Sequence, residues 1–485
     1  ITGGSAKFGG AIALDDGSCA LSMYGGEISG NKAIGDNKNP SKGGAIFLQK
    51  GGTVKIYGGT ISGNRAAASK KGSQGGAIYA GNGGNIILAG GTISGNTADN
   101  DGGAIFVGSS GIVTLSGTNL TGNNAKWGGA IYLTDNSTLN MSSGMLTQNT
   151  ASQQGGGVFI YKSGATCSLS GGTIEKNTAG VTGGAVYLND GKLKISGAPV
   201  VRDNTVSGAA NNVYLPSGKL LTISGDMKDG ASIGVTTANK SYPVAFSNAY
   251  ATDYRGFFHA DDAGAEVVYK TDKMLYLDAR QYEITIEDTD NGHATADSSR
   301  AAAGKRITLT AAPNVGYHFT DWTVSDDDIT ITKDASGKDG FVMPASNVTI
   351  QAVFAQHSFT AETAEETYLK TAADCENDAV YYKSCACGEK GTETFTKANS
   401  ALGHDYGAWT SNDNGTHTRI CSNDTSHTET KDCHGGTASC IAAAVCTDCG
   451  TAYGAKKPQN HADGCKLEWI TTEETHQQKY SKCGQ

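Results

Sequence analysis

The chain has 485 residues, including 68 glycines and 7 prolines; 38% of the residues are hydrophobic and the formal net charge is −9. This composition excludes a disordered chain and favours a β-structure with many turns. No basic stripe is interleaved with aromatic residues, so we expect no nucleic acid partner. No run of about 18 apolar residues occurs, so we expect no membrane insertion in this chain, which we expect to be a fragment.

Two motifs repeat together through residues 1–210. The segment Gly-Gly-Ala-Ile, complete or nearly so, begins at Gly9, Gly43, Gly75, Gly102, Gly128, Gly156 and Gly183. An asparagine keeps the same interval of roughly 26 to 34 residues, at Asn31, Asn64, Asn96, Asn123, Asn149, Asn177 and Asn204. Apolar residues two apart precede the asparagines, which is the spacing of β-strands. Each repeat therefore predicts about three short strands with glycine-rich corners.

A repeat of this size has no core of its own, but stacked repeats bury one. One column of the stack holds Ile12, Ile46, Ile78, Ile105, Ile131, Phe159 and Val186. We expect such columns to line the interior, with the asparagines forming an inner ladder of side-chain amides. The predicted fold is mainly β: a right-handed parallel β-helix, or solenoid, over residues 1–280. Regular coils are expected in 1–210 and closing coils or a cap in 211–280.

The paired motifs, as in Gly43-Gly44-Ala45-Ile46 and Ile61-Ser62-Gly63-Asn64, resemble the repeats of chlamydial polymorphic outer-membrane proteins and related pectate-lyase-like surface β-helices. The resemblance covers about residues 1–210 and implies an extracellular bacterial surface protein. Asn211-Asn212 departs from the pattern where Gly-Gly is expected, which indicates that regular winding ends there.

Many β-helices cleave polysaccharides, and glycoside hydrolysis needs two carboxylates about 5–10 Å apart. The turn after the first strand of each repeat carries Asp16, Lys50, Asn82, Ser109, Asp135, Ser163 and Asp190. No two acids of this column belong to adjacent repeats, so we expect no catalytic residue and no enzyme. The alternative is a secreted carbohydrate-active enzyme, a polysaccharide lyase or glycoside hydrolase, with its site on the β-helix.

A column of mostly aromatic residues is a candidate contact surface. The position after the isoleucine column holds Ala13, Phe47, Tyr79, Phe106, Tyr132, Ile160 and Tyr187. If this face points outward, Phe47, Tyr79, Phe106, Tyr132 and Tyr187 could stack on sugars or on partner side chains. The alternative is that the rings stack on one another and stabilise the rod.

Residues 281–356 alternate between apolar and polar positions like half-buried strands. The segments Gly316-Tyr317-His318-Phe319-x-x-Trp322 and Phe341-Val342-Met343-Pro344 resemble the divergent internalin B-type repeat of Gram-positive surface proteins. The resemblance implies a small β-rich spacer module. We interpret His318 as a half-buried packing residue.

Residues 357–485 are polar and cysteine-rich, so we expect small modules held together by crosslinks. The segment resembles cysteine-rich modules of Gram-positive surface proteins. Structural Zn²⁺ is one possibility and disulfides are the other. The first candidate zinc set is Cys440, Cys446, Cys449 and His461; the second is His417, Cys421, His427 and Cys433; a third, with irregular spacing, is Cys375, Cys385, Cys387 and His404.

These features together predict a non-catalytic bacterial protein of the cell surface, secreted or associated with the cell wall. The β-helix would be an adhesin-like binding rod or a spacer scaffold, with a glycan or a host or bacterial surface protein as its partner. We expect no cofactor for the β-helix and structural zinc only in residues 357–485.

Overall fold

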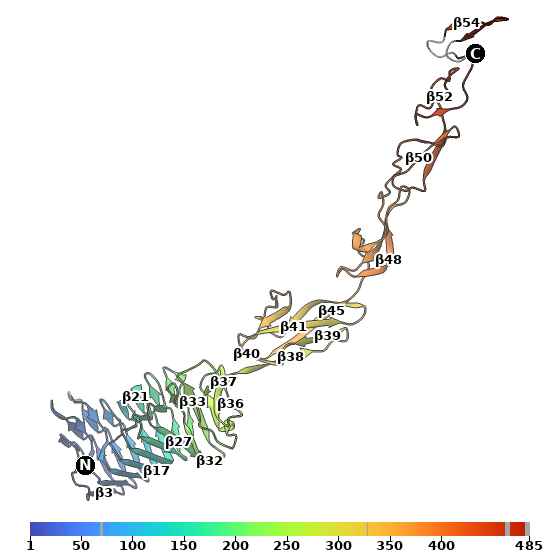
Figure 1. Cartoon of the computed structure of the whole chain (residues 1–485). Helices are drawn as coiled ribbons and strands as arrows, with labels where there is room; N and C mark the ends of the chain where they lie inside the picture. The colour runs from blue at the N-terminus through green and yellow to red at the C-terminus, as the bar shows by residue number, and fades with distance from the viewer. Residues whose placement is uncertain (68–70, 327, 461–465, 481–485) are drawn as a thin grey trace. The chain divides into compact units, whose positions relative to one another are not determined.

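The computed structural model describes residues 1–67, 71–326, 328–460 and 466–480. The chain divides into two compact units. The first comprises residues 1–286, 295–310 and 324–350, and the second comprises 287–294, 311–323 and 351–485. Residues 1–280 form a parallel β-solenoid of about nine turns, whose coils are stacked side by side in Figure 1.

Each regular coil contributes three strands to the main sheet and one to a second sheet. The first strands are β2 (Ile12–Leu14), β7 (Ile46–Lys50), β12 (Ile78–Asn82), β16 (Ile105–Val107), β19 (Ile131–Leu133), β22 (Val158–Ile160), β26 (Val186–Leu188) and β31 (Val213–Leu215). The second strands are β3 (Ala20–Met23), β8 (Thr53–Ile56), β13 (Asn85–Leu88), β23 (Thr166–Leu169), β27 (Lys192–Gly197) and β32 (Thr222–Met227). The third strands are β4 (Glu27–Ser29), β9 (Thr60–Ser62), β14 (Thr92–Ser94), β24 (Thr173–Glu175), β28 (Val200–Arg202) and β33 (Ser232–Thr237). In two coils these strands fuse into β17 (Ile112–Thr121) and β20 (Thr138–Thr147).

The second sheet lies in the part of the coil that follows the asparagine. It contains β1 (Ser5–Ala6), β5 (Lys32–Ile34), β10 (Arg65–Ala67), β15 (Thr97–Ala98), β18 (Asn124–Trp127), β21 (Thr150–Gln154), β25 (Thr178–Ala179), β29 (Thr205–Val206) and β30 (Ala209–Ala210), with β6 (Ser41–Lys42) and β11 (Ser73–Gln74) pairing beside it. All of these pairs are parallel except β29 with β30. Small alanines such as Ala66, Ala98 and Ala125 fill the inside of this sheet.

The isoleucine column is buried as expected, with one correction in register. Ile46, Ile78, Ile105 and Ile131 are fully buried and pair with one another in sequence. In the next coil Val158, not Phe159, pairs with Ile131. The reason is that three glycines follow one another there, and Gly155 rather than Gly156 adopts the positive φ of the corner. The predicted column was therefore one residue out of step in that coil: Val158 belongs to the isoleucine column, and Phe159 and Ile160 each occupy the position after the one predicted for them.

The seven asparagines form one buried column, each at most 1% exposed. The Nδ2 of each donates to the Oδ1 of the next at 2.8–3.0 Å, and so does its backbone N–H at 2.9–3.0 Å. The ladder continues from Asn204 to Asn212, which in turn donates to Asp261. The ladder satisfies backbone donors at a corner where the chain leaves strand geometry.

Residues 211–280 close the stack. Parallel pairing continues through β31, β33 and β35 (Phe258–Ala260), after a short 3₁₀ turn η1 (Arg255–Phe257). A three-stranded antiparallel sheet follows, of β34 (Val244–Ala245), β37 (Leu275–Ala279) and β36 (Ala265–Tyr269). Phe246, Phe258, Leu275 and Leu277 extend the solenoid core into this region, so the last coil is not left open.

Residues 281–356 form two four-stranded sheets around a separate core. One has the order β40 (Arg300–Ala302), β38 (Gln281–Glu287), β45 (Val348–Gln356) and β42 (Tyr317–Val324). The other has the order β39 (Gly292–Ala296), β41 (Arg306–Pro313), β44 (Asp339–Val342) and β43 (Thr332–Lys333). Ile307 and Phe341 are fully buried, as alternation in these strands predicts.

Residues 357–460 and 466–480 form a series of small antiparallel hairpins. They are β46 (Leu369–Thr371) with β47 (Val380–Ser384) and β48 (Lys390–Thr396), preceded by the 3₁₀ turn η2 (Glu366–Tyr368); β49 (Thr410–Ser411) with β50 (Thr416–Ile420) and β51 (Thr428–Asp432); β52 (Ala444–Val445) with β53 (Ala452–Tyr453); and β54 (Leu467–Thr471) with β55 (His476–Tyr480). In this region the buried side chains include the cysteines Cys375, Cys385, Cys421, Cys433 and Cys446, and few large apolar residues.

Candidate binding groove and candidate metal centres

An outward-facing column of varied residues precedes the glycine corner of each coil. Its members are Phe8, Lys42, Gln74, Asp101, Trp127, Gln154 and Thr182, and neighbouring members pair between successive coils. All seven are half-buried. The sequence analysis did not single out this column. The available signal was positional, because each residue stands directly before the first glycine of the corner.

The aromatic column is a continuous stack on the outer face of the first strands, with Phe8 from the column before the corner glycines stacked on its end. Ring centroids lie 5.0–5.6 Å apart along the series Phe8, Phe47, Tyr79, Phe106, Tyr132, Phe159, Tyr187 and Tyr214. Phe159 takes the place predicted for Ile160, which is buried in the core instead. Phe47, Tyr79, Phe106 and Tyr132 are only 4–8% exposed. Their ring faces are occupied by neighbouring rings, so the predicted stacking of sugars on those faces has no room, and only ring edges and hydroxyls reach solvent.

Between these features lies an elongated groove with a volume of about 690 Å³. The aromatic stack forms its floor, from Tyr79 to Tyr187. One wall is the column before the corner glycines, represented by Gln74, Asp101, Trp127 and Gln154. The other wall comes from the turn after the first strand, through Asn82, Ser109, Asp135, Lys162 and Asn189. Because strands of adjacent coils lie about 4.8 Å apart, the five coils from Asn82 to Asn189 give a groove roughly 20 Å long.

Asp101 has the most perturbed carboxyl in the groove. Burial raises its pKa to about 6, although a hydrogen bond from Gln74 and the charge of Lys126 act in the opposite direction. Burial, and next the charge of Asp101, also raise the pKa of the Tyr132 hydroxyl. Trp127 donates its indole N–H to Gln154 Oε1 at 3.1 Å, and Lys126 Nζ lies 4.2 Å from the Trp127 ring centroid. The wall therefore combines a carboxyl that titrates near pH 6 with amide groups and one large ring.

The turn column examined for catalytic acids contributes unevenly to the groove. Asn82, Ser109 and Asp135 line it, whereas Asp190 forms an ion pair with Lys219. Asp101 and Asp135 are the two carboxylates in the lining, and they belong to opposite walls and to successive coils. The sequence analysis considered only one of these walls.

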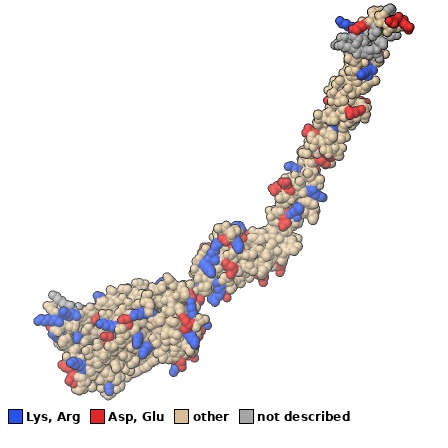
Figure 2. All heavy atoms as spheres, in the orientation of Figure 1, with Lys and Arg blue, Asp and Glu red and all other residues tan. Residues whose placement is uncertain are grey.

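Figure 2 shows lysines, arginines and acidic residues scattered over the face of the solenoid in view, without a stripe of one sign. The described residues include no helix long and apolar enough to cross a membrane.

The described hairpin region contains three groups of cysteines and histidines, which are the donor types that bind transition metals. One of these groups also includes a histidine from β42 and one that directly follows β45. The most buried contains His417, Cys433, Cys446 and Cys449. His417 Nδ1 lies 3.2 Å from Cys446 Sγ and 3.6 Å from Cys433 Sγ, and the sulfurs of Cys433 and Cys449 are 3.9 Å apart. Tetrahedral bonds of about 2.0–2.3 Å place ligand atoms roughly 3.3–3.8 Å from one another. These distances fit one metal ion and no disulfide.

The surroundings of this group favour metal binding. Burial acts to raise the pKa of the Cys446 thiol, but the backbone N–H groups of Cys449 and Asp448 outweigh it and lower that pKa to about 6. His417 is 0% exposed, and within the part of the chain that the structure describes its Nε2 has no hydrogen-bond partner. Asp448 Oδ2 lies 3.6 Å from this atom. A carboxylate beside the second ring nitrogen is the usual support of a metal-bound histidine.

The second group contains Cys375, His404, Cys421 and His427. Cys375, His404 and Cys421 form one set of close ligand atoms, and His427 Nδ1 lies 2.8 Å from Cys375 Sγ. The third group contains His318, His357, Cys385 and Cys387. The cysteines of the three groups are not disulfide-bonded.

The predicted ligand sets are therefore regrouped. Cys446 and Cys449 meet His417 and Cys433 instead of Cys440; His461 lies outside the described residues. The second predicted set is split, because Cys421 and His427 join Cys375 and His404. The third set is also split, because Cys385 and Cys387 join His318, which we had interpreted as a packing residue. Spacing along the chain failed here because each group combines ligands from consecutive modules.

Two segments match known families. Residues 282–358 match the divergent InlB B-repeat domain, and residues 90–108 match the Chlamydia polymorphic membrane protein repeat. Both resemblances expected from the sequence are thereby confirmed. No curated protein and no solved structure matches the chain.

Proposed function

We propose that this chain is part of an adhesin-like bacterial surface protein whose β-solenoid binds a polysaccharide along the groove without cleaving it. The observation that carries the proposal is the elongated groove with its aromatic floor and amide-rich walls. The likeness of its repeats to those of surface proteins supports an extracellular location.

The lining is suited to a hydroxyl-rich chain. Gln74, Asn82, Gln154 and Asn189 offer both donors and acceptors, as sugar hydroxyls require. The floor supplies apolar ring edges, and Trp127 supplies a larger apolar surface on one wall. A groove of roughly 20 Å matches a linear polymer better than a single small molecule.

A glycan array probed with the full chain tests this proposal, followed by titration with the polysaccharide that binds. Trp127→Ala should weaken binding at least about tenfold, which corresponds to about 1.4 kcal/mol. Tyr57→Ala is the matched control, because Tyr57 is 44% exposed and stacks on Tyr24 instead of lining the groove. Absence of any bound glycan, or equal losses in both variants, would refute the proposal.

A second function is supported by one observation, the raised pKa of Asp101. A carboxyl that stays protonated up to about pH 6 is suited to general acid catalysis in a glycoside hydrolase. The same polysaccharides should therefore be assayed for new reducing ends and unsaturated sugars. We expect none; release that disappears in Asp101→Asn would replace the binding function by the enzymatic one.

For the groups built on His417 and on Cys375, we propose Zn²⁺ as the metal, with a structural role. Mixed thiolate and imidazole ligands favour this ion, and in the His417 group they lie at distances close to those of a tetrahedral site. The hairpins bury few large apolar residues, so a metal would supply part of their folding free energy. Zinc analysis of the reduced full chain tests this assignment.

A further inference from the structure

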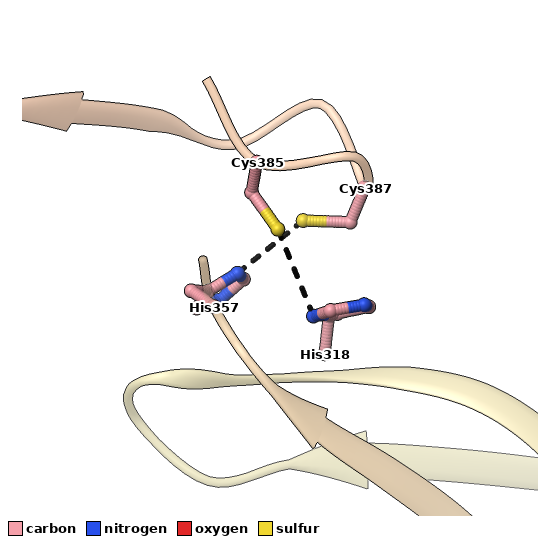
Figure 3. A group of neighbouring side chains, drawn as sticks. All are labelled: His318, His357, Cys385 and Cys387. Carbon is pink, nitrogen blue, oxygen red and sulfur yellow. Dashed lines mark hydrogen bonds between the residues drawn. The ribbon is translucent and has the colours of Figure 1, made fainter. Parts of the chain in front are cut away.

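A group of four candidate metal ligands lies where the module of residues 281–356 meets the first cysteine-containing hairpin. Figure 3 shows His318, His357, Cys385 and Cys387 converging on one point. His318 comes from β42, His357 follows β45 directly, and the two cysteines lie between β47 and β48. All four ligand atoms lie within 4.8 Å of one another.

The distances within this group are close to those of a tetrahedral centre. His357 Nδ1 lies 3.3 Å from Cys387 Sγ, and His318 Nδ1 lies 4.0 Å from Cys385 Sγ. The two imidazole rings are stacked with their centroids 5.2 Å apart. Each ring directs its Nδ1 toward the sulfurs. Ordinary packing of two histidines does not require two thiols at that position.

The turn that carries the cysteines has the form of a metal-binding loop. Gly388 follows Cys387 with φ +93°, and its N–H donates to the carbonyl of Cys385 at 2.9 Å. The turn of the Cys446 group is similar, since Gly450 has φ +70° and its N–H donates to the carbonyl of Cys446 at 3.0 Å. In both cases the closed turn directs two sulfurs to one side.

The three groups share one plan. In each, the turn of a hairpin provides two ligands, and the preceding module provides the other two. The turn ligands are Cys385 and Cys387, Cys421 and His427, and Cys446 and Cys449; the ligands from the preceding module are His318 and His357, Cys375 and His404, and His417 and Cys433. Each group thus joins consecutive modules instead of stabilising one module internally.

We propose that His318, His357, Cys385 and Cys387 bind one Zn²⁺ that fastens the β-module of residues 281–356 to the following hairpin, as the first of a series of intermodule metal crosslinks. The inference extends the zinc assignment of the hairpins, and it fails separately if the hairpins bind zinc and this site does not.

The test uses the reduced full chain, freed of loosely bound metal by gel filtration and analysed for zinc. His318→Ala/His357→Ala should bind about one zinc ion per chain fewer than the wild type. His293→Ala is the matched control, because His293 lies in the same module with its side chain 68% exposed and outside this group. Amide hydrogen exchange should become faster in residues 357–369 of the double variant and stay unchanged in the solenoid.

A ligand exchange separates metal binding from a folding defect. His357→Cys should keep the full zinc content, and with Co²⁺ it should increase the sulfur-to-metal charge-transfer absorption because one more thiolate is bound. If the double variant retains all of the zinc, the intermodule site is refuted while the hairpin sites stand. If the wild type binds no zinc, both assignments are refuted.

Discussion

Replacing Asn123 by alanine removes one step of the buried asparagine ladder. Its Oδ1 accepts hydrogen bonds from the backbone N–H and from the Nδ2 of Asn96, both at 3.0 Å, and the site is 0% exposed. Alanine leaves the backbone N–H of Asn96 without an acceptor, whereas the Nδ2 of Asn96 still donates to the carbonyls of Ile61 and Ser94. At about 1–3 kcal/mol for one unsatisfied buried donor, the free energy of unfolding should fall by about 1–3 kcal/mol. Asn149 keeps one donor, because the backbone N–H of residue 123 still reaches its Oδ1.

The adjacent Asn124→Ala is a matched control, because the Asn124 side chain is exposed and its backbone N–H bond to the Asn96 carbonyl is unaffected. Urea unfolding followed by circular dichroism measures the global change. Hydrogen exchange in peptides from residues 90–125 measures the local one, since stability in a stacked repeat is largely a nearest-neighbour property. If Asn123→Ala costs no more than Asn124→Ala, the ladder does not stabilise the coils and this reasoning is wrong.

Three further predictions concern other parts of the chain. The pKa of Asp101 is about 6 in the folded protein and near 3.8 in the unfolded chain, so its contribution to stability is complete below pH 3.8 and is lost as the pH rises through 6. Asp101→Asn should remove this pH dependence from thermal unfolding measured between pH 4 and 7. An unchanged pH profile in the variant would contradict the prediction. Gly103→Ala places a Cβ 2.1 Å from the carbonyl oxygen of Gly129 and should cost more than about 3 kcal/mol in urea unfolding, whereas Gly25→Ala, with open space around it, should cost under about 1 kcal/mol. Cys446→Ala should lower the zinc content by about one ion per chain, while Cys167→Ala, in the solenoid core, should leave it unchanged; equal zinc in both would exclude the site.

The fold was predictable because its determinants recur at fixed intervals. Ile61 and Asn64 stand three residues apart in a motif that returns in every coil, and a column of identical residues needs no three-dimensional information to be recognised. The register error at Phe159 arose because Gly155 begins a run of three glycines in which only φ distinguishes the corner. Parallel coils also continue past Asn211-Asn212, where the sequence indicated that regular winding ends. The metal groups were less predictable. His318 and Cys385 are distant in sequence, and their proximity depends on how two modules pack.

The position of the column before the corner glycines explains why its residues differ from coil to coil while the glycines that follow them do not. A Cβ on Gly75 would lie 2.2 Å from the carbonyl oxygen of Ile78, so any residue other than glycine would clash at that position. The residue just before the corner is half-buried and faces outward, and the fold accepts Lys42, Gln74, Asp101 and Trp127 at equivalent places. Packing inside the solenoid therefore does not determine these side chains. Gln74, Asp101 and Trp127 line the groove. Under the proposed function, the chemistry of the bound polysaccharide is the remaining constraint on their identity.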